Sequence, residues 1–187
     1  MTAQRARRRT DAESSDPQVE ALRREVEALR AEVGRLETLA DRDVLTPLYN
    51  RRAFVRELSR AIAFCRRYEA SAVLLYLDLD GFKGVNDAYG HAAGDAALIR
   101  VAEILLGNVR ESDVAARLGG DEFAVLLFQA GEDEARAKAD RLAELIAAAG
   151  EGLGATFGVR AFDGQEDAQA WLAEADAAMF VRKTSRR

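Results

Sequence analysis

The chain has 187 residues, of which 49% are hydrophobic, enough for one compact domain with a full core and an additional segment. Its 27 basic and 32 acidic residues give a net charge of −5, which disfavours broad nucleic-acid binding because no basic excess exists to neutralise phosphates. The single cysteine excludes an internal disulfide and is typical of a cytoplasmic protein. No apolar run approaches the roughly 18 residues that a membrane span needs.

Two segments are expected before the main domain. Residues 1–16 are predicted to form a disordered tail, and residues 17–42 a helix with heptad order. Valine recurs at one heptad position and leucine at another, at Val19, Val26 and Val33 and at Leu22, Leu29 and Leu36. This pattern favours a parallel two-stranded coiled coil, so we expect a homodimer through Val19–Ala40, weak because three heptads are few. The alternative is a single helix packed on its own domain.

From residue 43 onward, strand patterns alternate with helix patterns, which indicates an α/β domain over residues 43–187. Residues 43–49 are a turn-rich connector in which Pro47 blocks a helix, and Asn50 is expected to cap the next one. The expected elements are helix 50–68, strand 71–77, a turn and short helix 80–89, helix 92–109, strands 113–118 and 123–128, helix 132–149, strand 154–161 and one or two helices in 168–183.

The turn between the two adjacent strands carries the chemistry, with the sequence Gly119-Gly120-Asp121-Glu122-Phe123. Its glycines allow tight backbone geometry and close approach of a bulky anion, and its adjacent carboxylates suit a hard divalent cation. A second acidic cluster, Asp78-Leu79-Asp80, ends the apolar strand 71–77. If the two strands are neighbours, their carboxylates converge, as in a site for metal-assisted phosphoryl or nucleotidyl transfer.

Five motifs follow one another in a specific order. They are Asp43–Arg52, Asp78–Lys83 with Asn86-Asp87, Tyr89–His91 with Gly94-Asp95, the 119–123 turn, and Ala175–Lys183. Together they resemble the GGDEF domain of diguanylate cyclases, which join two GTP molecules into cyclic di-GMP. The resemblance implies a fold similar to the palm of nucleotidyl cyclases: a central, mostly antiparallel sheet flanked by helices, here preceded by the coiled-coil helix.

The same resemblance implies the metal ligands and the catalytic groups. Mg²⁺, with Mn²⁺ as the alternative, is expected at Asp78, at the Leu79 carbonyl and at Asp121, with Glu122 as a ligand of a second metal. Asp121, Glu122 and Lys83 are expected to be catalytic, and Asp121 to help deprotonate the attacking 3′-hydroxyl. The ordinary alternative for these carboxylates is solvation at a turn.

Substrate contacts are also implied. Phe82 and Lys83 begin a short helix facing the phosphates, Lys183 and Arg187 are expected as further phosphate contacts, and Asn86 and Asp95 as guanine readers. Ordinary alternatives are surface lysines and helix caps. Asp80 is expected to orient its turn by accepting hydrogen bonds from backbone amides, and His91 to bridge its loop. Pro47, Thr156 and Arg186 depart from the residues that are usual in the family.

A further motif lies five residues before the 119–123 turn, which is the signature turn of the family: Arg110-Glu111-Ser112-Asp113. It resembles the RxxD inhibitory site at which the product binds in this family, with Arg110 and Asp113 as the contacts. The alternative is an ordinary surface pair.

We therefore predict a cytoplasmic diguanylate cyclase whose two domains face each other, each holding one GTP. Each 3′-hydroxyl attacks the α-phosphate of the other nucleotide, and two pyrophosphates leave. Control is expected through dimer affinity, through product at the RxxD site, or through a partner that binds the coil. The alternatives are a non-catalytic receptor for GTP or cyclic di-GMP that signals through the coil, and a dimer that only scaffolds.

Overall fold

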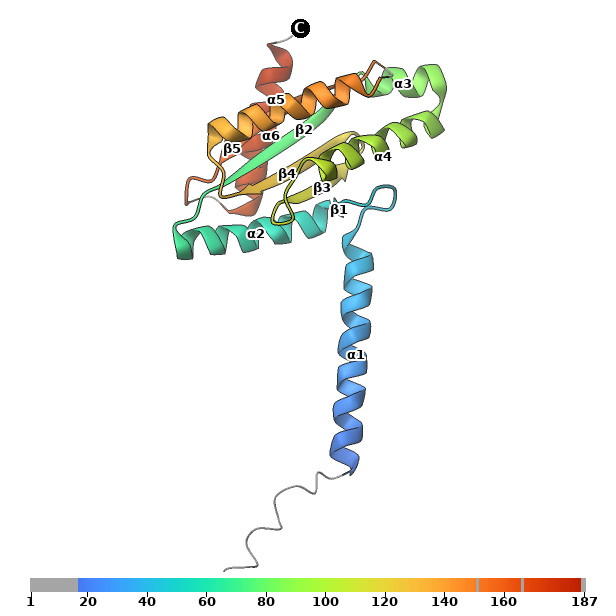
Figure 1. Ribbon diagram of the computed structural model, residues 1–187, viewed down its shortest axis with the longest axis vertical. Helices are drawn as coiled ribbons and strands as arrows, with labels where there is room; N and C mark the ends of the chain where they lie inside the picture. Colours follow the sequence, from blue (N-terminus) through green and yellow to red (C-terminus); the bar gives the residue numbers. More distant parts are fainter. Residues whose placement is uncertain (1–16, 151, 166, 186–187) are drawn as a thin grey trace, which may run out of the picture. The chain divides into compact units, whose positions relative to one another are not determined.

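The computed structural model describes residues 17–150, 152–165 and 167–185, in two compact units that divide between Ala40 and Asp41. The predicted helix is confirmed as α1 (Pro17–Asp41), drawn in blue in Figure 1. Its apolar heptad residues form a seam, of which Val19, Leu22, Val26 and Leu29 are described. They are exposed in the single chain, from 42% at Val26 to 64% at Leu22. The expected tail, Arg187 and the side chains at 33 and 36 lie outside the described residues.

The second unit is built on one five-stranded sheet (Figure 1). The strands lie in the order β1 (Tyr49–Asn50), β3 (Val114–Gly119), β4 (Glu122–Phe128), β2 (Ala72–Asp80) and β5 (Gly154–Ala161). Only β1 and β3 pair in parallel; the other pairs are antiparallel. The expectation of a mostly antiparallel sheet is therefore confirmed, and the short strand β1 is an addition that its two residues did not signal.

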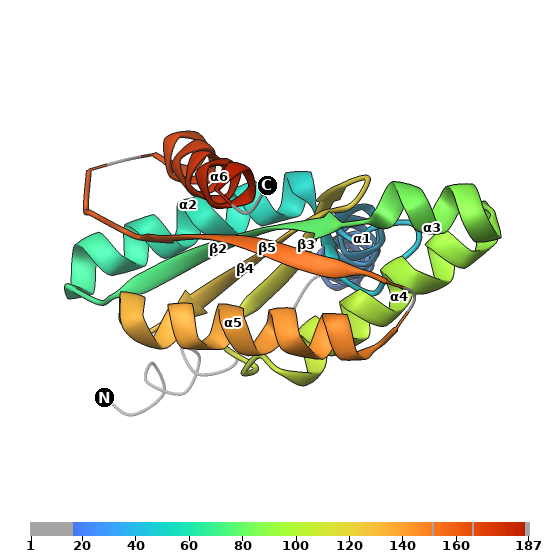
Figure 2. The ribbon, with the colours of Figure 1, turned by 90° about the horizontal axis from the view of Figure 1, so that it is seen from above.

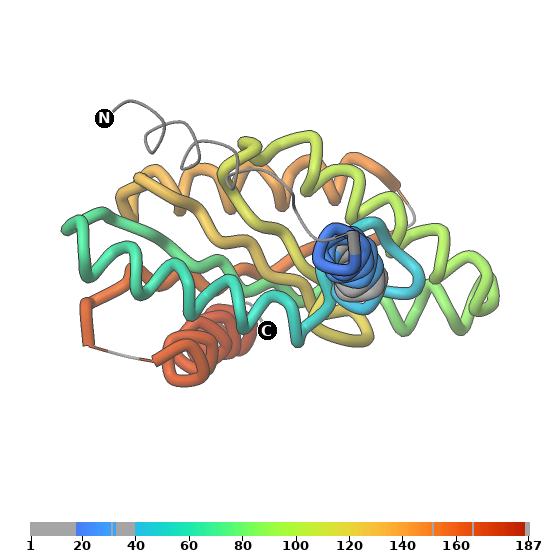
Figure 3. Tube along the Cα trace, turned by 90° about the horizontal axis from the view of Figure 1, so that it is seen from below, coloured from blue at the N-terminus to red at the C-terminus, as the bar shows by residue number. Residues whose placement is uncertain are grey.

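Helices cover both faces of this sheet (Figures 2 and 3). One face carries α2 (Arg51–Tyr68) and α6 (Ala168–Thr184), and the other carries α4 (His91–Gly107) and α5 (Glu132–Ala148). Because side chains alternate along a strand, Leu74 and Tyr76 of β2 pack towards α2 and α6, while Leu75 and Leu77 pack on the opposite face. The short helix α3 (Phe82–Tyr89) follows β2 and packs on α4.

Strand β2 runs three residues further than predicted. Asp78, Leu79 and Asp80 stay in the strand because they pair with Thr156, Ala155 and Gly154 of β5. The acidic cluster therefore lies inside the sheet, and the side chains of Asp78 and Asp80 share the face that carries α6.

Other expectations are corrected in smaller ways. Residues 168–184 form a single helix. His91 begins α4 and is exposed, and its ring hydrogen-bonds to none of the described residues, so the bridge expected for it is wrong. Among the described residues, no helix combines the length and apolar character that crossing a membrane requires.

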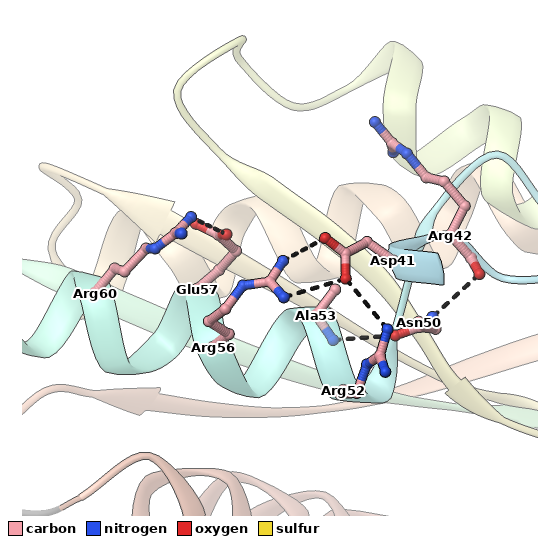
Figure 4. Close-up of polar contacts among 8 residues, drawn as sticks. All are labelled: Asp41, Arg42, Asn50, Arg52, Ala53, Arg56, Glu57 and Arg60. Carbon is pink, nitrogen blue, oxygen red and sulfur yellow. Dashed lines mark hydrogen bonds and ion pairs between the residues drawn. The ribbon is translucent and has the colours of Figure 1, made fainter. Parts of the chain in front are cut away.

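The junction that leads into α2 is fixed by a group of polar contacts (Figure 4). Asn50 caps α2 as predicted, since its Oδ1 accepts a hydrogen bond of 3.0 Å from the amide of Ala53, and its Nδ2 donates to the Arg42 carbonyl. Both carboxylate oxygens of Asp41 accept from Arg56, and Arg52 lies 3.6 Å away. The hydrogen bond from Arg56 lowers the pKa of Asp41 below its ordinary value, so Asp41 is held as a carboxylate.

Gly158 sets how closely α6 approaches the sheet. A Cβ atom there would lie 2.0 Å from the Ala175 carbonyl oxygen and 2.5 Å from the Met179 amide nitrogen, both of them backbone atoms of α6. Gly158→Ala is therefore expected to lower the free energy of unfolding by about 3 kcal/mol in urea denaturation. Gly107→Ala is the control because a Cβ there meets no atom within 4 Å. Equal stability of the two variants would contradict the close approach.

Candidate functional site

The two acidic segments meet because β2 and β4 are neighbours. In their antiparallel register Asp78 lies directly opposite Glu122. The amide of Leu79 donates a hydrogen bond of 3.2 Å to the carbonyl of Asp121, which joins the turn to the end of β2. Gly120 in this turn has a φ of +52°, a left-handed conformation that favours glycine. The convergence expected from the sequence is therefore present.

A lysine from the far end of the chain completes this cluster. Nζ of Lys183, in the last turn of α6, contacts Oδ1 of Asp78 and lies 3.6 Å from Oδ1 of Asp80. The other oxygen of Asp80 accepts a hydrogen bond of 2.7 Å from the hydroxyl of Thr156. The expectation that Asp80 binds backbone amides is wrong, because Asp80 remains in β2 beside β5. The cluster thus unites β2, β5 and α6.

The site carries an excess of negative charge. Burial raises the pKa of Asp78 above its ordinary value, and the charges of Asp121 and Asp80 add to this, although Lys183 acts in the opposite direction. Burial lowers the pKa of Lys183, but the hydrogen bond and charge of Asp78 outweigh it, so that pKa is raised. The ammonium is therefore firmly protonated, and the carboxylates around it favour additional positive charge.

The chemistry of the donor groups fits a hard divalent cation. Asp78, Asp121, Glu122 and the Leu79 carbonyl all offer oxygen, which Mg²⁺ prefers. In the described part of the chain, however, no three acidic, histidine or cysteine side chains are grouped so that they could hold a metal ion. Glu122 interacts with Tyr76, whose pKa is raised by burial and then by the charge and hydrogen bond of Glu122. The metal ligands therefore stay a prediction.

A pocket of about 440 Å³ opens beside this cluster. Its lining includes three of the predicted substrate-binding residues, Phe82, Lys83 and Lys183. It also includes Leu79 and Asp121 from the predicted metal site. The volume is in the range of pockets that hold small molecules. Residues from β2, α3, the turn and α6 are thus brought to one cavity.

The two predicted guanine readers lie near each other but do not line this pocket. Asn86 belongs to α3 and the exposed Asp95 to α4. The Asn86 side chain lies over Gly94, where a Cβ would be only 2.0 Å from its Oδ1. Gly94 therefore lets the Asn86 amide sit beside Asp95.

One arginine that sequence reasoning missed holds the signature turn. Arg117 donates two hydrogen bonds, of 3.0 and 2.7 Å, to the Gly120 carbonyl and a third, of 3.2 Å, to Oδ1 of Asp43. The same Asp43 oxygen accepts from the amides of Leu45 and Thr46 and from the Thr46 hydroxyl. The connector is thus linked to the turn through one guanidinium. The only available signal was an arginine within an otherwise apolar strand.

Asp43 also contributes a pH-dependent part of the stability. Burial raises its pKa, but hydrogen bonds from Thr46 and Arg117 outweigh burial, so the pKa is lowered below its ordinary value. A carboxyl with a lowered pKa in the folded state stabilises the fold above its unfolded pKa. That contribution is lost as the pH falls through the lowered value.

The RxxD motif lies at the opposite end of the β3–β4 hairpin from the turn. Asp113 accepts hydrogen bonds from the amides of Arg110, at 2.9 Å, and Phe128, at 3.2 Å. The exposed Arg110 side chain pairs with Glu134 at 3.3 Å. Arg110 and Ser112 also line a pocket of about 570 Å³ together with α2. Asp113 therefore has a structural role, and the inhibitory role of both residues stays a prediction.

Comparison with known proteins gives a consistent result. The family described as "Diguanylate cyclase, GGDEF domain" matches residues 40–187. The diguanylate cyclase TpbB of Pseudomonas aeruginosa is 39% identical over 157 residues, which cover 79% of this chain and 36% of TpbB. This chain therefore spans only about a third of that relative.

Solved structures match over most of the chain. One is the structure of the coiled coil and GGDEF domain of DgcB from Caulobacter crescentus in complex with c-di-GMP. It matches with a TM-score of 0.80 at 28% sequence identity, and the match covers 91% of this chain and 94% of the DgcB chain. The diguanylate cyclase SiaD from Pseudomonas aeruginosa, in complex with its activator SiaC, has a TM-score of 0.74 at 31% identity, covering 90% and 69%.

Removing Arg117 is expected to destabilise the fold. Its side chain is 12% exposed and that of Asp43 16%, so Arg117→Met leaves a mostly buried carboxylate without its guanidinium. The free energy of unfolding should fall by about 3 kcal/mol, measured by urea denaturation at pH 7. Arg136→Met is the matched control, because the Arg136–Glu132 pair lies on the exposed surface of α5 and is worth less than about 1 kcal/mol. A similar loss of unfolding free energy in both variants would contradict a stabilising role of the Arg117–Asp43 link.

Proposed function

Because this chain belongs to the GGDEF family of diguanylate cyclases, we propose that it condenses two GTP molecules into cyclic di-GMP and releases two pyrophosphates. The observation that carries the proposal is the meeting of Asp78 with the Asp121–Glu122 turn beside a pocket lined by Lys83 and Lys183. Carboxylates suit the metal that phosphoryl chemistry uses, and lysines suit a triphosphate.

In the proposed mechanism, Asp78, Asp121, Glu122 and the Leu79 carbonyl would hold Mg²⁺, or Mn²⁺ in its place, which supplies charge neutralisation at the phosphates and activation of the hydroxyl. Lys83 and Lys183 bind the triphosphate from two sides of the pocket, next to Phe82. Asp121 accepts the proton of the attacking 3′-hydroxyl. Arg187, which lies outside the described residues, is a further phosphate contact in this proposal.

Guanine selection is assigned to Asn86 and Asp95. A carboxylate at Asp95 accepts hydrogen bonds from N1 and N2 of guanine, and the Asn86 amide bonds O6 or N3. Adenine offers no matching pair of donors, so these two side chains would favour GTP. The close packing of Asn86 over Gly94 supports a fixed geometry for this pair.

One domain carries only half of the reaction, so two domains have to face each other. We propose that a parallel coiled coil of Val19–Ala40 forms a homodimer and raises the local concentration of the second domain. The exposure of Val19, Leu22, Val26 and Leu29 in the single chain supports this, because a partner helix would cover that apolar seam.

Control is assigned to the dimer, to the product and to a partner. Product would bind Arg110 and Asp113, and DgcB, a structural relative, is in complex with c-di-GMP. SiaD, another relative, is in complex with an activator, which supports a regulator, here one that binds the coil, as a candidate partner. We place the protein in the cytoplasm, where GTP is available.

The proposal is tested by incubating the full chain with GTP and Mg²⁺ and separating the nucleotides by chromatography. Cyclic di-GMP is expected from the native chain, and Asp121→Ala should lower turnover by about 100-fold or more, since a metal ligand and proton acceptor is lost. Asp133→Ala, which removes an exposed carboxylate in the first turn of α5, is the control and should keep activity. If the native chain also forms no cyclic di-GMP, the result would instead favour the non-catalytic receptor for GTP or cyclic di-GMP.

The role of the coil is tested by placing charge in the seam. Leu22→Asp combined with Leu29→Asp should give a monomer in light scattering and, at about 1 µM protein, turnover about 100-fold lower, because the second domain is no longer tethered. Arg24→Asp changes the same helix outside the seam and should remain dimeric and active. A monomer with undiminished turnover would refute the coupling between dimer and activity.

A further inference from the structure

The Lys183 ammonium is a cation already present at the proposed metal site. It contacts Asp78, a proposed metal ligand, and lies 3.6 Å from Asp80. Within residues 17–150, 152–165 and 167–185, it is the only cationic side chain that forms an ion pair with either carboxylate. The side chains are 26% exposed at Lys183 and 18% at Asp78, so solvent screens the contact only in part.

An ammonium and a divalent cation repel each other when they share one carboxylate. A metal ion that binds Asp78 therefore has to compete with Lys183 for the same carboxylate. The competition follows from the placement of charges alone.

Lys183 is well placed to move when it is displaced. It stands in the last turn of α6, and its four-carbon stem lets Nζ shift while the helix stays in place. It also lines the 440 Å³ pocket with Lys83, so an ammonium released from Asp78 remains beside the space assigned to the triphosphate. Asp80, held by the Thr156 hydroxyl, is a second carboxylate near Nζ in its present position.

We propose that Lys183 is a resident counter-ion of the metal site, which a divalent cation displaces from Asp78 and which then binds the nucleotide phosphates. This rests on the proposed function, since it takes Asp78 as a metal ligand. The consequence is coupling: metal alone binds weakly because it has to expel Lys183, whereas metal together with a triphosphate binds well because the phosphates receive the displaced ammonium.

The test is a titration of the full chain with Mn²⁺ alone, in which free Mn²⁺ is followed by electron paramagnetic resonance. Lys183→Met should bind Mn²⁺ on the order of tenfold more tightly than the native chain, because the competing charge is gone. Arg182→Met is the matched control: Arg182 precedes Lys183 on α6 but pairs with Asp140, at 2.8 Å, and its loss should leave the affinity unchanged. Lys183→Gln is a second variant in case methionine perturbs the fold.

A second titration uses a non-hydrolysable GTP analogue with Mn²⁺ present. Here Lys183→Met should bind on the order of tenfold more weakly, because one phosphate contact is lost. Opposite changes in the two titrations are the expected signature, which a purely structural effect does not produce. The counter-ion role is overturned if neither Lys183→Met nor Lys183→Gln binds Mn²⁺ more tightly than the native chain does. It is also overturned if none of the proteins binds Mn²⁺ detectably.

The outcome is separable from the proposed activity. Tighter Mn²⁺ binding without cyclic di-GMP formation would leave the counter-ion role standing and remove the enzyme. Cyclic di-GMP formation with unchanged Mn²⁺ affinity would remove the counter-ion role and leave the enzyme.

Discussion

The antiparallel register between β2 and β4 is the constraint on which the site depends. It sets Asp78 opposite Glu122 and brings the Asp121 carbonyl to the Leu79 amide. Because side chains alternate along a strand, a slip of one residue would turn Asp78 towards the apolar face that carries α4 and α5. In the observed register, β2 is buried almost throughout, and its apolar side chains pack on the helices of both faces. The packing of the core and the position of the carboxylates therefore depend on the same strand register.

The site itself opposes folding, and the surroundings compensate. The raised pKa of Asp78 means that its charge is less stable in the folded state than in water. Lys183 offsets part of this effect, and it reaches Asp78 from α6, which lies close against Gly158 of β5. A glycine in the middle of a strand is unfavourable in isolation. Here it lets a helix that is distant in sequence deliver a cation to the sheet.

The sequence predicted the strands that carry the acidic residues, since apolar runs and a glycine turn are local signals. The sequence did not predict that β2 and β4 are neighbours: the convergence of the carboxylates was inferred on the assumption that they are. The sheet topology was expected from the family resemblance. Three features were not predictable because they join distant residues: the Arg117 link to Asp43, the Thr156 hydroxyl on Asp80, and the close approach at Gly158. The extension of β2 was missed for the same reason, since its last residues are strand through pairing with β5 and, at Asp78, also with β4.

The RxxD motif and the signature turn lie at opposite ends of one hairpin. Asp113 precedes β3 and accepts from the Phe128 amide at the end of β4, so it closes the open end, while Asp121 lies in the turn. A ligand that takes Asp113 as its hydrogen-bond acceptor therefore competes with the bonds that hold that end together. The exposed Arg110 can be engaged by breaking only its ion pair with Glu134. Engaging the Arg110 side chain therefore disturbs the hairpin less than engaging Asp113, whose carboxylate holds two backbone amides.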